Sequence, residues 1–234
     1  MASTVALIGG GIKGAVAAAR FAPSSELALV HVDFGQPSSE TEANAASLLA
    51  RSFPNARVIK LDLPHAARLD RMKERPAPRP GPRQSRAAST GAPSAASLQG
   101  LMPVLLSVGV QCALRIGARR VVTGLVGQVD ASHAGLTLVE GQPGRCREFI
   151  HAFNLMSEGL YPQRTSIHVE APLIDLGYPE VVKLAFHFQL PVEDLWSCQR
   201  AGPRPCRRCR SCTTRARAFA DARLDDPLFV PTEV

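Results

Sequence analysis

The chain has 234 residues, 45% of them hydrophobic, which is enough for one sizeable core or for a core with a small appendage. It contains no run of about 18 apolar residues and no signal-peptide pattern at its N-terminus, so we expect a cytoplasmic protein that does not span a membrane. The net charge of +7 gives only weak support for nucleic acid as a partner, because basic side chains also simply solvate a surface.

The first part of the chain, up to about residue 70, alternates short apolar runs with segments typical of helices. The runs are rich in β-branched residues, as are strands buried on both faces of a parallel sheet. We expect strands at TVALI (4–8), LALVHVDF (27–34) and ARVIKLDL (56–63), and helices at AVAAARF (15–21) and ETEANAASLLARSF (40–53). This alternation predicts an α/β fold with a doubly wound parallel sheet.

Residues 71–97, RMKERPAPRPGPRQSRAASTGAPSAAS, differ from the rest of the chain in composition. Proline, arginine, serine and alanine dominate, so the segment cannot bury enough apolar surface to offset the entropy lost on ordering. We expect a long mobile loop, whose length is unusual for a connection within a compact domain.

Beyond this segment the strand and helix signals resume. We expect helices at LMPVLLSVGVQCALRIGA (101–118), CREFIHAFNLMSEGL (146–160) and YPEVVKLAFHFQL (178–190), and strands at RRVVTGLV (119–126) and SIHVEAPL (166–173). Cys112 in an apolar helix and His31 in a strand are expected to be packed in the core. The scheme gives one α/β domain over residues 1–195 and a smaller C-terminal unit over 196–234.

A glycine motif follows the first predicted strand. Gly9, Gly11 and Gly14 fit the pattern G-x-G-x-x-G, and Asp33 ends the second predicted strand. A strand, such a turn, a helix and an acidic residue about twenty positions further on outline a dinucleotide-binding site. Taken alone, the motif would indicate a nicotinamide- or flavin-dependent oxidoreductase.

Four of the six cysteines lie close together near the C-terminus. Cys198, Cys206, Cys209 and Cys212 have the spacing C-x7-C-x2-C-x2-C, with which thiolates can surround one tetrahedral zinc ion. Such a closed site has no open position, so its role would be structural. Disulfides and an iron–sulfur cluster are alternatives, although no secretion signal favours disulfides and the proline-flanked fourth cysteine of a typical cluster is missing.

The cysteine array and its flanks resemble the zinc module that ends the 7-cyano-7-deazaguanine synthases. The segment LWSCQRAGPRPCRRCRSCTTRARAF (195–219) carries a Ser-Cys pair, the cysteine pattern and an arginine-containing helix. Upstream, HVDFGQ (31–36), RCREFIHAF (145–153) and EAPLIDLGYPEVVKLAFHFQLPVEDLWSC (170–198) are similar to further stretches of that family, in the same order. The resemblance implies the fold of the adenine nucleotide alpha hydrolases, with an ATP pyrophosphatase loop after the first strand.

The resemblance gives the glycine-rich loop a second interpretation. In that family the loop reads Ser-Gly-Gly-x-Asp-Ser and holds the phosphates of ATP. Here Gly9 and Gly14 stand in place of the two serines, and Lys13 stands in place of the aspartate. The nucleotide-binding residues that the resemblance implies are Gly9, Gly10, Gly11, Lys13, Gly14 and Asp33.

The altered loop bears on catalysis. The resembled enzymes use ATP and magnesium to activate a carboxylate on a deazaguanine, form an amide with ammonia and dehydrate it to a nitrile. Gly9 and Gly14 supply no hydroxyl, and Lys13 would repel Mg²⁺. We therefore expect a divergent protein of the queuosine pathway with lost or altered catalysis; if active, it would be an ATP-dependent carbon–nitrogen ligase. Zinc is the expected cofactor, with ATP and magnesium only if the loop still binds them.

The substrate side corresponds less closely. The family's Gly-Tyr-Pro-Asp-Cys-Arg, preceded by an aspartate and a serine, is matched only by VDASHAGLTLVEGQPGRCR (129–147), which contains an insertion. A Pro-x-Arg-Asn stretch is replaced by LQGLMP (98–103). The substrate-binding residues that the resemblance implies are Gly124, Asp130, Ser132 and Arg147.

The resemblance also implies the partners. We expect a small deazapurine or nucleotide ligand and, since the family forms dimers, a second copy of the chain. Trp196, the only tryptophan, is expected to anchor the zinc module to the sheet. Two alternatives stay open at this point: an RNA- or nucleotide-binding module on the same scaffold, and the dinucleotide-dependent oxidoreductase.

Overall fold

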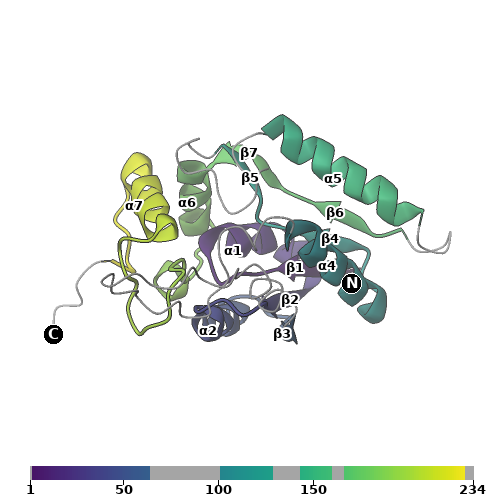
Figure 1. Ribbon diagram of the computed structural model, residues 1–234, viewed down its shortest axis with the longest axis horizontal. Helices are drawn as coiled ribbons and strands as arrows, with labels where there is room; N and C mark the ends of the chain where they lie inside the picture. Colours follow the sequence, from purple (N-terminus) through teal and green to yellow (C-terminus); the bar gives the residue numbers. More distant parts are fainter. Residues whose placement is uncertain (1, 64–100, 129–142, 160–165, 230–234) are drawn as a thin grey trace, which may run out of the picture.

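The computed structural model describes residues 2–63, 101–128, 143–159 and 166–229 (Figure 1). The expected mobile loop at 71–97 lies outside these ranges. In chain order the elements are β1 (Ala2–Leu7), α1 (Ile12–Ala19), η1 (Ala22–Ser24), β2 (Ser25–Asp33), α2 (Ser39–Ala50), β3 (Ala56–Asp62), α4 (Leu101–Ile116), β4 (Arg120–Val122), β5 (Val126–Gln128), α5 (Pro143–Glu158), β6 (His168–Glu170), β7 (Leu173–Gly177), α6 (Tyr178–His187), η3 (Val192–Asp194) and α7 (Arg210–Ala222). None of the helices in the described ranges combines the length and apolarity that crossing a membrane requires.

Five strands form a parallel sheet, as the alternation of elements predicted, and their order is β3-β2-β1-β4-β6. Val5 at the centre of β1 pairs with Ala28 on β2 and with Val121 on β4. The strand order reverses beside β1, because β2 and β4 lie on its two sides. Open α/β sheets bind ligands at such a point, beyond the carboxyl ends of the strands.

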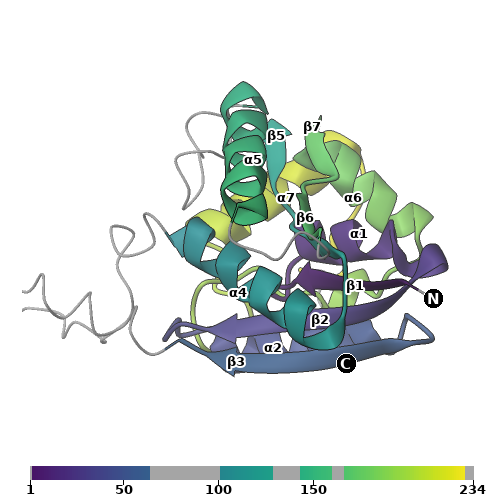
Figure 2. The same ribbon diagram turned by 90° about the vertical axis from the view of Figure 1, so that its right-hand side faces the viewer.

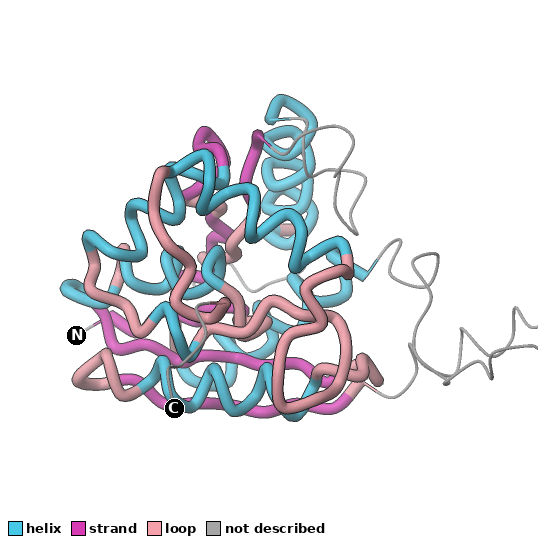
Figure 3. Tube along the Cα trace, turned by 90° about the vertical axis from the view of Figure 1, so that its left-hand side faces the viewer, coloured by secondary structure: helices cyan, strands magenta, loops and turns pink. Residues whose placement is uncertain are grey.

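Helices cover both faces of this sheet, which confirms the doubly wound α/β fold. Val5 and Val30 pack with α4 and α5, whereas Ala6 and Leu29 pack with α1, α2, α6 and α7. Figure 1 shows the two groups of helices on opposite sides of the sheet. Figure 2 looks onto the side of α4 and α5, and Figure 3 onto the side where α6, α7 and the C-terminal loops lie in front of the strands.

Two stretches expected as single strands are each divided in the structure. Residues 119–126 contain β4 and the start of β5, and residues 166–173 contain β6 and the start of β7; β5 and β7 pair in a separate two-stranded sheet. At Gly124 the chain passes so close to α1 that a Cβ would lie 2.6 Å from the backbone nitrogen of Gly14. Pro172, between β6 and β7, has no N–H for a ladder bond. The expectation of continuous strands was therefore wrong.

The C-terminal helix packs onto the main domain. α7 lies against α6, and Ala218 and Phe219 of α7 belong to the same buried cluster as α1. The ring of Phe219 meets that of Phe186 edge to face, with centroids 6.3 Å apart. The module that carries the cysteines thus shares the core of the sheet domain.

Candidate functional site

The glycine-rich loop joins β1 to α1, as predicted. β1 ends at Leu7 and α1 begins at Ile12, with Gly11 as its N-cap. Gly10 has a φ of +70°, and a Cβ at this position would lie 2.8 Å from the Cα of Glu42 on α2. Only glycine fits there, both for its backbone conformation and for the close approach of α2.

A cavity of about 370 Å³ opens beside this loop, a volume within the range of small-molecule sites. The lining residues from the ends of β1 and β2 and from α4 are apolar: Leu7, Ile8, Val30, Val32, Phe34, Leu101, Met102 and Leu105. The polar lining residues come from α1, α2, the end of β4, α6 and the C-terminal segment: Lys13, Glu42, Thr123, Tyr178, Ser197, Gln199, Arg210, Ser211 and Thr214. Such a cavity can receive a ligand that has an apolar ring at one end and a polar or charged group at the other.

Lys13 lies in the first turn of α1, with its Nζ 5.8 Å from the centre of the Tyr178 ring. Burial raises the pKa of Tyr178, whereas the charges of Lys13 and Arg215 and a hydrogen bond with Ser197 act to lower it. The phenol is therefore neutral at physiological pH. It presents an aromatic face to the lysine cation at the cavity wall.

Glu42 is a lining residue that the sequence analysis did not single out. Its Oε1 accepts a hydrogen bond from Ser38 Oγ at 2.6 Å, and its Oε2 accepts one from Gln36 Nε2 at 3.0 Å. Gln36 also donates to the carbonyl oxygen of Val32 at 3.1 Å and accepts from the N–H of Phe34 at 2.9 Å. The HVDFGQ stretch had pointed to this turn, but no spacing rule shows that a carboxylate of the next helix reaches the cavity.

The C-terminal segment reaches back to the glycine-rich loop through Trp196. Its backbone N–H donates to the carbonyl oxygen of Gly10 at 2.9 Å, and a Cβ on Gly11 would lie 3.5 Å from its carbonyl oxygen. The indole Nε1 donates to the carbonyl oxygen of Cys198 at 2.8 Å, and the ring packs with Ala45 of α2. Trp196 therefore anchors the cysteine module to the first loop and to α2, rather than to the strands as we expected.

The four C-terminal cysteines come together as a candidate metal site. Their Sγ atoms all lie within 4.8 Å of one another, and those of Cys198 and Cys209 are 3.9 Å apart, close to the edge of about 3.8 Å of a tetrahedron with Zn–S distances of about 2.3 Å. Backbone N–H groups of Arg200 and Cys206 donate to the Cys198 sulfur at 3.4 Å, and that of Cys209 donates to the Cys206 sulfur at 3.2 Å. All six cysteines lie in the described ranges, and the structure places none of them in a disulfide.

The protonation of these thiols suits a cation. Burial acts to raise the pKa of Cys206, but hydrogen bonds from the backbone N–H groups of Arg208 and Cys209 and from neighbouring thiols lower it to about 6. Burial raises the pKa of Cys198 and of Cys212. Binding of a metal ion would displace the remaining protons. Four soft sulfur ligands with no open position could hold zinc in a structural role.

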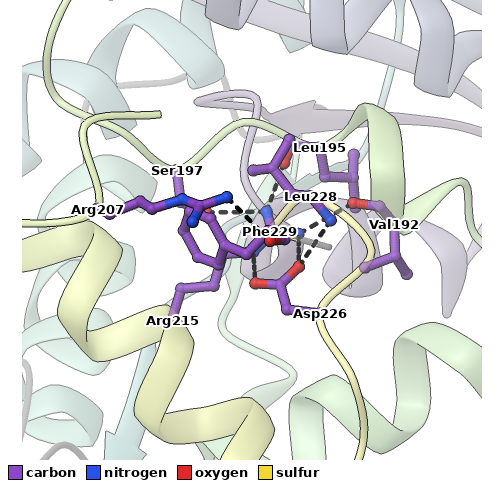
Figure 4. A network of polar contacts seen from close by, with 8 residues as sticks. All are labelled: Val192, Leu195, Ser197, Arg207, Arg215, Asp226, Leu228 and Phe229. Atoms are coloured by element: carbon purple, nitrogen blue, oxygen red, sulfur yellow. Dashed lines mark hydrogen bonds and ion pairs between the residues drawn. The ribbon is translucent and has the colours of Figure 1, made fainter. Parts of the chain in front are cut away.

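Arg215 on α7 is fully buried and ties the module to the rest of the protein (Figure 4). Its Nε and Nη2 donate to the two carboxylate oxygens of Asp226, both at 2.7 Å. Nη2 also donates to the carbonyl oxygen of Val192 at 3.0 Å, and Nη1 donates to the carbonyl oxygen of Leu195 and to Ser197 Oγ. These five bonds match the five N–H donors of a guanidinium. Because Ser197 also lines the cavity, the network fixes part of its wall.

The predicted nucleotide-binding residues fall into two groups. Gly9, Gly11, Lys13 and Gly14 all line the cavity. Gly10 is held behind them by α2 and by Trp196. Asp33 is not among the described lining residues, because its Oδ1 turns to accept the N–H of Gly35 at 2.7 Å.

The predicted substrate-binding residues do not gather in the described part of the cavity. Gly124 lines it, whereas Arg147 on α5 is about half exposed and forms an ion pair with Asp175 of β7. Asp130 and Ser132 lie outside the described residues.

The two predicted core residues are packed as expected. His31 is buried, with its Nδ1 3.2 Å from the carbonyl oxygen of Ile8 and its Nε2 3.4 Å from Ser39 Oγ. Cys112 packs against the buried cluster of α4 and α5. Neither lines the cavity in the described residues.

Comparison with known proteins matches nearly the whole chain. A family model described as queuosine biosynthesis protein QueC matches residues 3–223. A 7-cyano-7-deazaguanine synthase of Methanosarcina mazei is 29% identical over 235 residues, covering 96% of each chain. One from Chlorobium phaeobacteroides strain BS1 is 30% identical over 228 residues, covering 96% of this chain and 95% of the relative. The matched region includes both the glycine-rich loop and the four-cysteine cluster.

Proposed function

Because the chain belongs to the family of the queuosine biosynthesis protein QueC, we propose that its cavity binds a deazapurine or a nucleotide and that its ATP chemistry is lost or altered. One observation carries the proposal: loop 9–14 lines the cavity without a hydroxyl or carboxylate of its own. The name of the relatives, 7-cyano-7-deazaguanine synthase, supports a deazaguanine as the ring of the ligand.

The loop can bind an anion. It leads directly into α1, whose N-terminus favours negative charge, and Lys13 adds a cation at the cavity wall. A phosphate or a carboxylate suits these surroundings. Activation of a carboxylate by ATP, however, needs Mg²⁺ to neutralise the triphosphate, and a lysine repels that ion. The site therefore binds its ligand without efficient turnover of ATP; an active form would be an ATP-dependent carbon–nitrogen ligase.

The metal completes the proposal. Cys198, Cys206, Cys209 and Cys212 would hold one zinc ion that stabilises the C-terminal module and takes no part in the chemistry. The short separations between all four sulfurs support a single ion, because the thiolates of an iron–sulfur cluster bind separate iron atoms and lie further apart.

Binding and product assays test the proposal. We expect isothermal titration to detect binding of ATP–Mg²⁺ or of 7-carboxy-7-deazaguanine. We expect chromatography to detect no nitrile after incubation of the protein with both compounds and ammonia. Lys13→Gln should weaken the binding, while Lys183→Gln, on the exposed face of α6, should not. Nitrile formation on the order of 1 per second would contradict the loss of ATP chemistry. Failure to bind either compound would contradict the cavity as the ligand site.

A further inference from the structure

Part of the cavity wall comes from the cysteine module itself. Gln199, Arg210, Ser211 and Thr214 all line the cavity. Arg210 and Ser211 occupy the interval between the last two cysteines of the cluster, and Gln199 directly follows its first. The residues between the metal ligands, rather than the ligands, therefore reach the cavity.

This wall carries the kinds of group that the glycine-rich loop lacks. Gly9 and Gly14 bring no side chain to the cavity, whereas Ser211 and Thr214 bring hydroxyls and Arg210 brings a guanidinium. Hydroxyl and guanidinium groups donate to phosphate and carboxylate oxygens, and such bonds to a charged acceptor are the stronger kind. The donors for an anion thus come from both ends of the chain.

The charges of the described lining favour an anionic ligand. Lys13 and Arg210 are the positive side chains in it, and Glu42 is the negative one. Both oxygens of Glu42 already accept hydrogen bonds, from Ser38 and Gln36. A ligand with negative charge is attracted to the two cations and meets a carboxylate that is already solvated by protein groups.

The position of Arg210 is fixed on both sides. Cys209 precedes it and Cys212 follows two residues later, so a bound metal ion would hold the backbone around it. One turn further along α7, the buried Arg215 attaches the same helix to Val192 and Asp226. A ligand therefore meets a binding group whose backbone is already ordered, so that only its side chain has to lose conformational freedom.

We propose that Arg210, assisted by Ser211, is the residue of this cavity that binds the anionic group of the ligand. The cysteine module then determines ligand specificity in addition to stabilising the fold. The inference rests on the proposed function, because it takes the cavity as the ligand site.

Titration of the zinc-loaded protein tests this role with two pairs of compounds that share a ring and differ in charge. The pairs are ATP with adenosine, and 7-carboxy-7-deazaguanine with 7-deazaguanine. Arg210→Gln should lower the affinity for the anionic compound that binds by about 10-fold or more, and should change the affinity for its uncharged counterpart by less than about twofold. Arg208→Gln is the matched control, because it removes the same charge from the preceding cysteine interval and does not line the described cavity.

Each outcome separates this inference from the proposed function. Elemental analysis must show that Arg210→Gln keeps the wild-type metal content. If it does not, Ser211→Ala is used instead, and its affinity for the anionic compound alone should fall by about threefold or more. The role of Arg210 would be overturned if its substitution lowered the affinities for the charged and uncharged compounds equally, or if Arg208→Gln lowered the affinity for the anion as much as Arg210→Gln does. The proposed function would still stand. A wild-type protein that binds neither anionic compound would overturn both.

Discussion

The guanidinium of Arg215 donates two hydrogen bonds, each 2.7 Å long, to the carboxylate of Asp226, and neither side chain is more than 6% exposed. Asp226 also accepts the N–H of Leu228 at 3.1 Å. Arg215→Gln would leave this carboxylate buried without its cation. We expect the free energy of unfolding, measured by urea denaturation, to fall by about 3–5 kcal/mol.

A second arginine on the same helix provides the control. Arg217 lies 3.7 Å from Asp221, and both side chains are more than half exposed. Arg217→Gln should change the free energy of unfolding by less than about 0.5 kcal/mol, because exposed pairs are screened by water. If the two variants lose similar amounts, the buried pair does not hold the module in place.

The metal site predicts about one zinc ion per chain in purified protein, determined by elemental analysis. Cys209→Ser should lose most of the metal, because one of four thiolates is gone, while Cys112→Ser in α4 should keep it. Loss of metal should also speed tryptic cleavage at the arginines between residues 200 and 210, since binding and local folding are coupled. Iron in the protein, or no metal under reducing conditions, would refute this assignment.

Gly124→Ala should destabilise the protein by about 1–3 kcal/mol in urea denaturation, because its Cβ would lie 2.6 Å from the backbone of Lys13 and Gly14. Gly9→Ala is the control, because it adds the same methyl group at a position where no atom lies within 4 Å of a Cβ. Its stability should stay close to that of the wild type. A tolerated Gly124→Ala would mean that α1 can move away from the end of β4.

The loop can be rebuilt with Gly9→Ser, Lys13→Asp and Gly14→Ser. Both glycine positions can accept a Cβ, because one on Gly14 has only ordinary contacts of 3.4 Å and more, and one on Gly9 has no atom within 4 Å. We expect titration to show ATP–Mg²⁺ bound at least about 10-fold more tightly, because hydroxyls and a carboxylate replace hydrogens and an ammonium. Chromatography should still detect no nitrile. Product formation would show that the loop alone had limited catalysis.

The partly buried phenol of Tyr178 predicts a loss of stability at alkaline pH. Burial raises its pKa above the ordinary value of 10.0, so the unfolded chain releases this proton first as the pH rises. The contribution is therefore complete below pH 10 and is lost as the pH rises through the folded-state pKa. Absorbance titration of the wild type against Tyr178→Phe should show the phenolate only above that ordinary value. A phenolate that forms earlier would mean that the charge of Lys13 outweighs burial.

The sheet could be predicted from the sequence because its signals are local. The continuous apolar runs of β1 and β2, with an alanine-rich helix between them, can only be buried in a covered parallel sheet. The end of β4 could not be predicted, because it depends on Gly124 meeting the backbone of α1, a contact between residues far apart in the sequence. The break between β6 and β7 falls at Pro172, whose missing N–H can be read from the sequence.

The same distinction applies to the site. Three of the four clustered cysteines lie within one short C-x2-C-x2-C run, so their meeting follows from spacing. Ser211 and Thr214 look like ordinary helix residues. They reach the cavity because Trp196 bonds to Gly10 and because Arg215 attaches α7 to the segment at Val192, and both contacts join parts of the chain that are far apart in the sequence. No pattern within either segment contains that information.

The hydrogen bond from Trp196 to Gly10 also bears on how the protein folds during its synthesis on the ribosome. A ribosome releases the glycine-rich loop early, and β1, α1 and β2 can assemble on the nascent chain from neighbouring contacts. The partner of the Gly10 carbonyl is translated much later, and pairing over so long a stretch of chain is slow. Chains from interrupted translation therefore lack the part of the polar wall that residues 197–214 supply, and only those that include the C-terminal segment acquire a complete cavity.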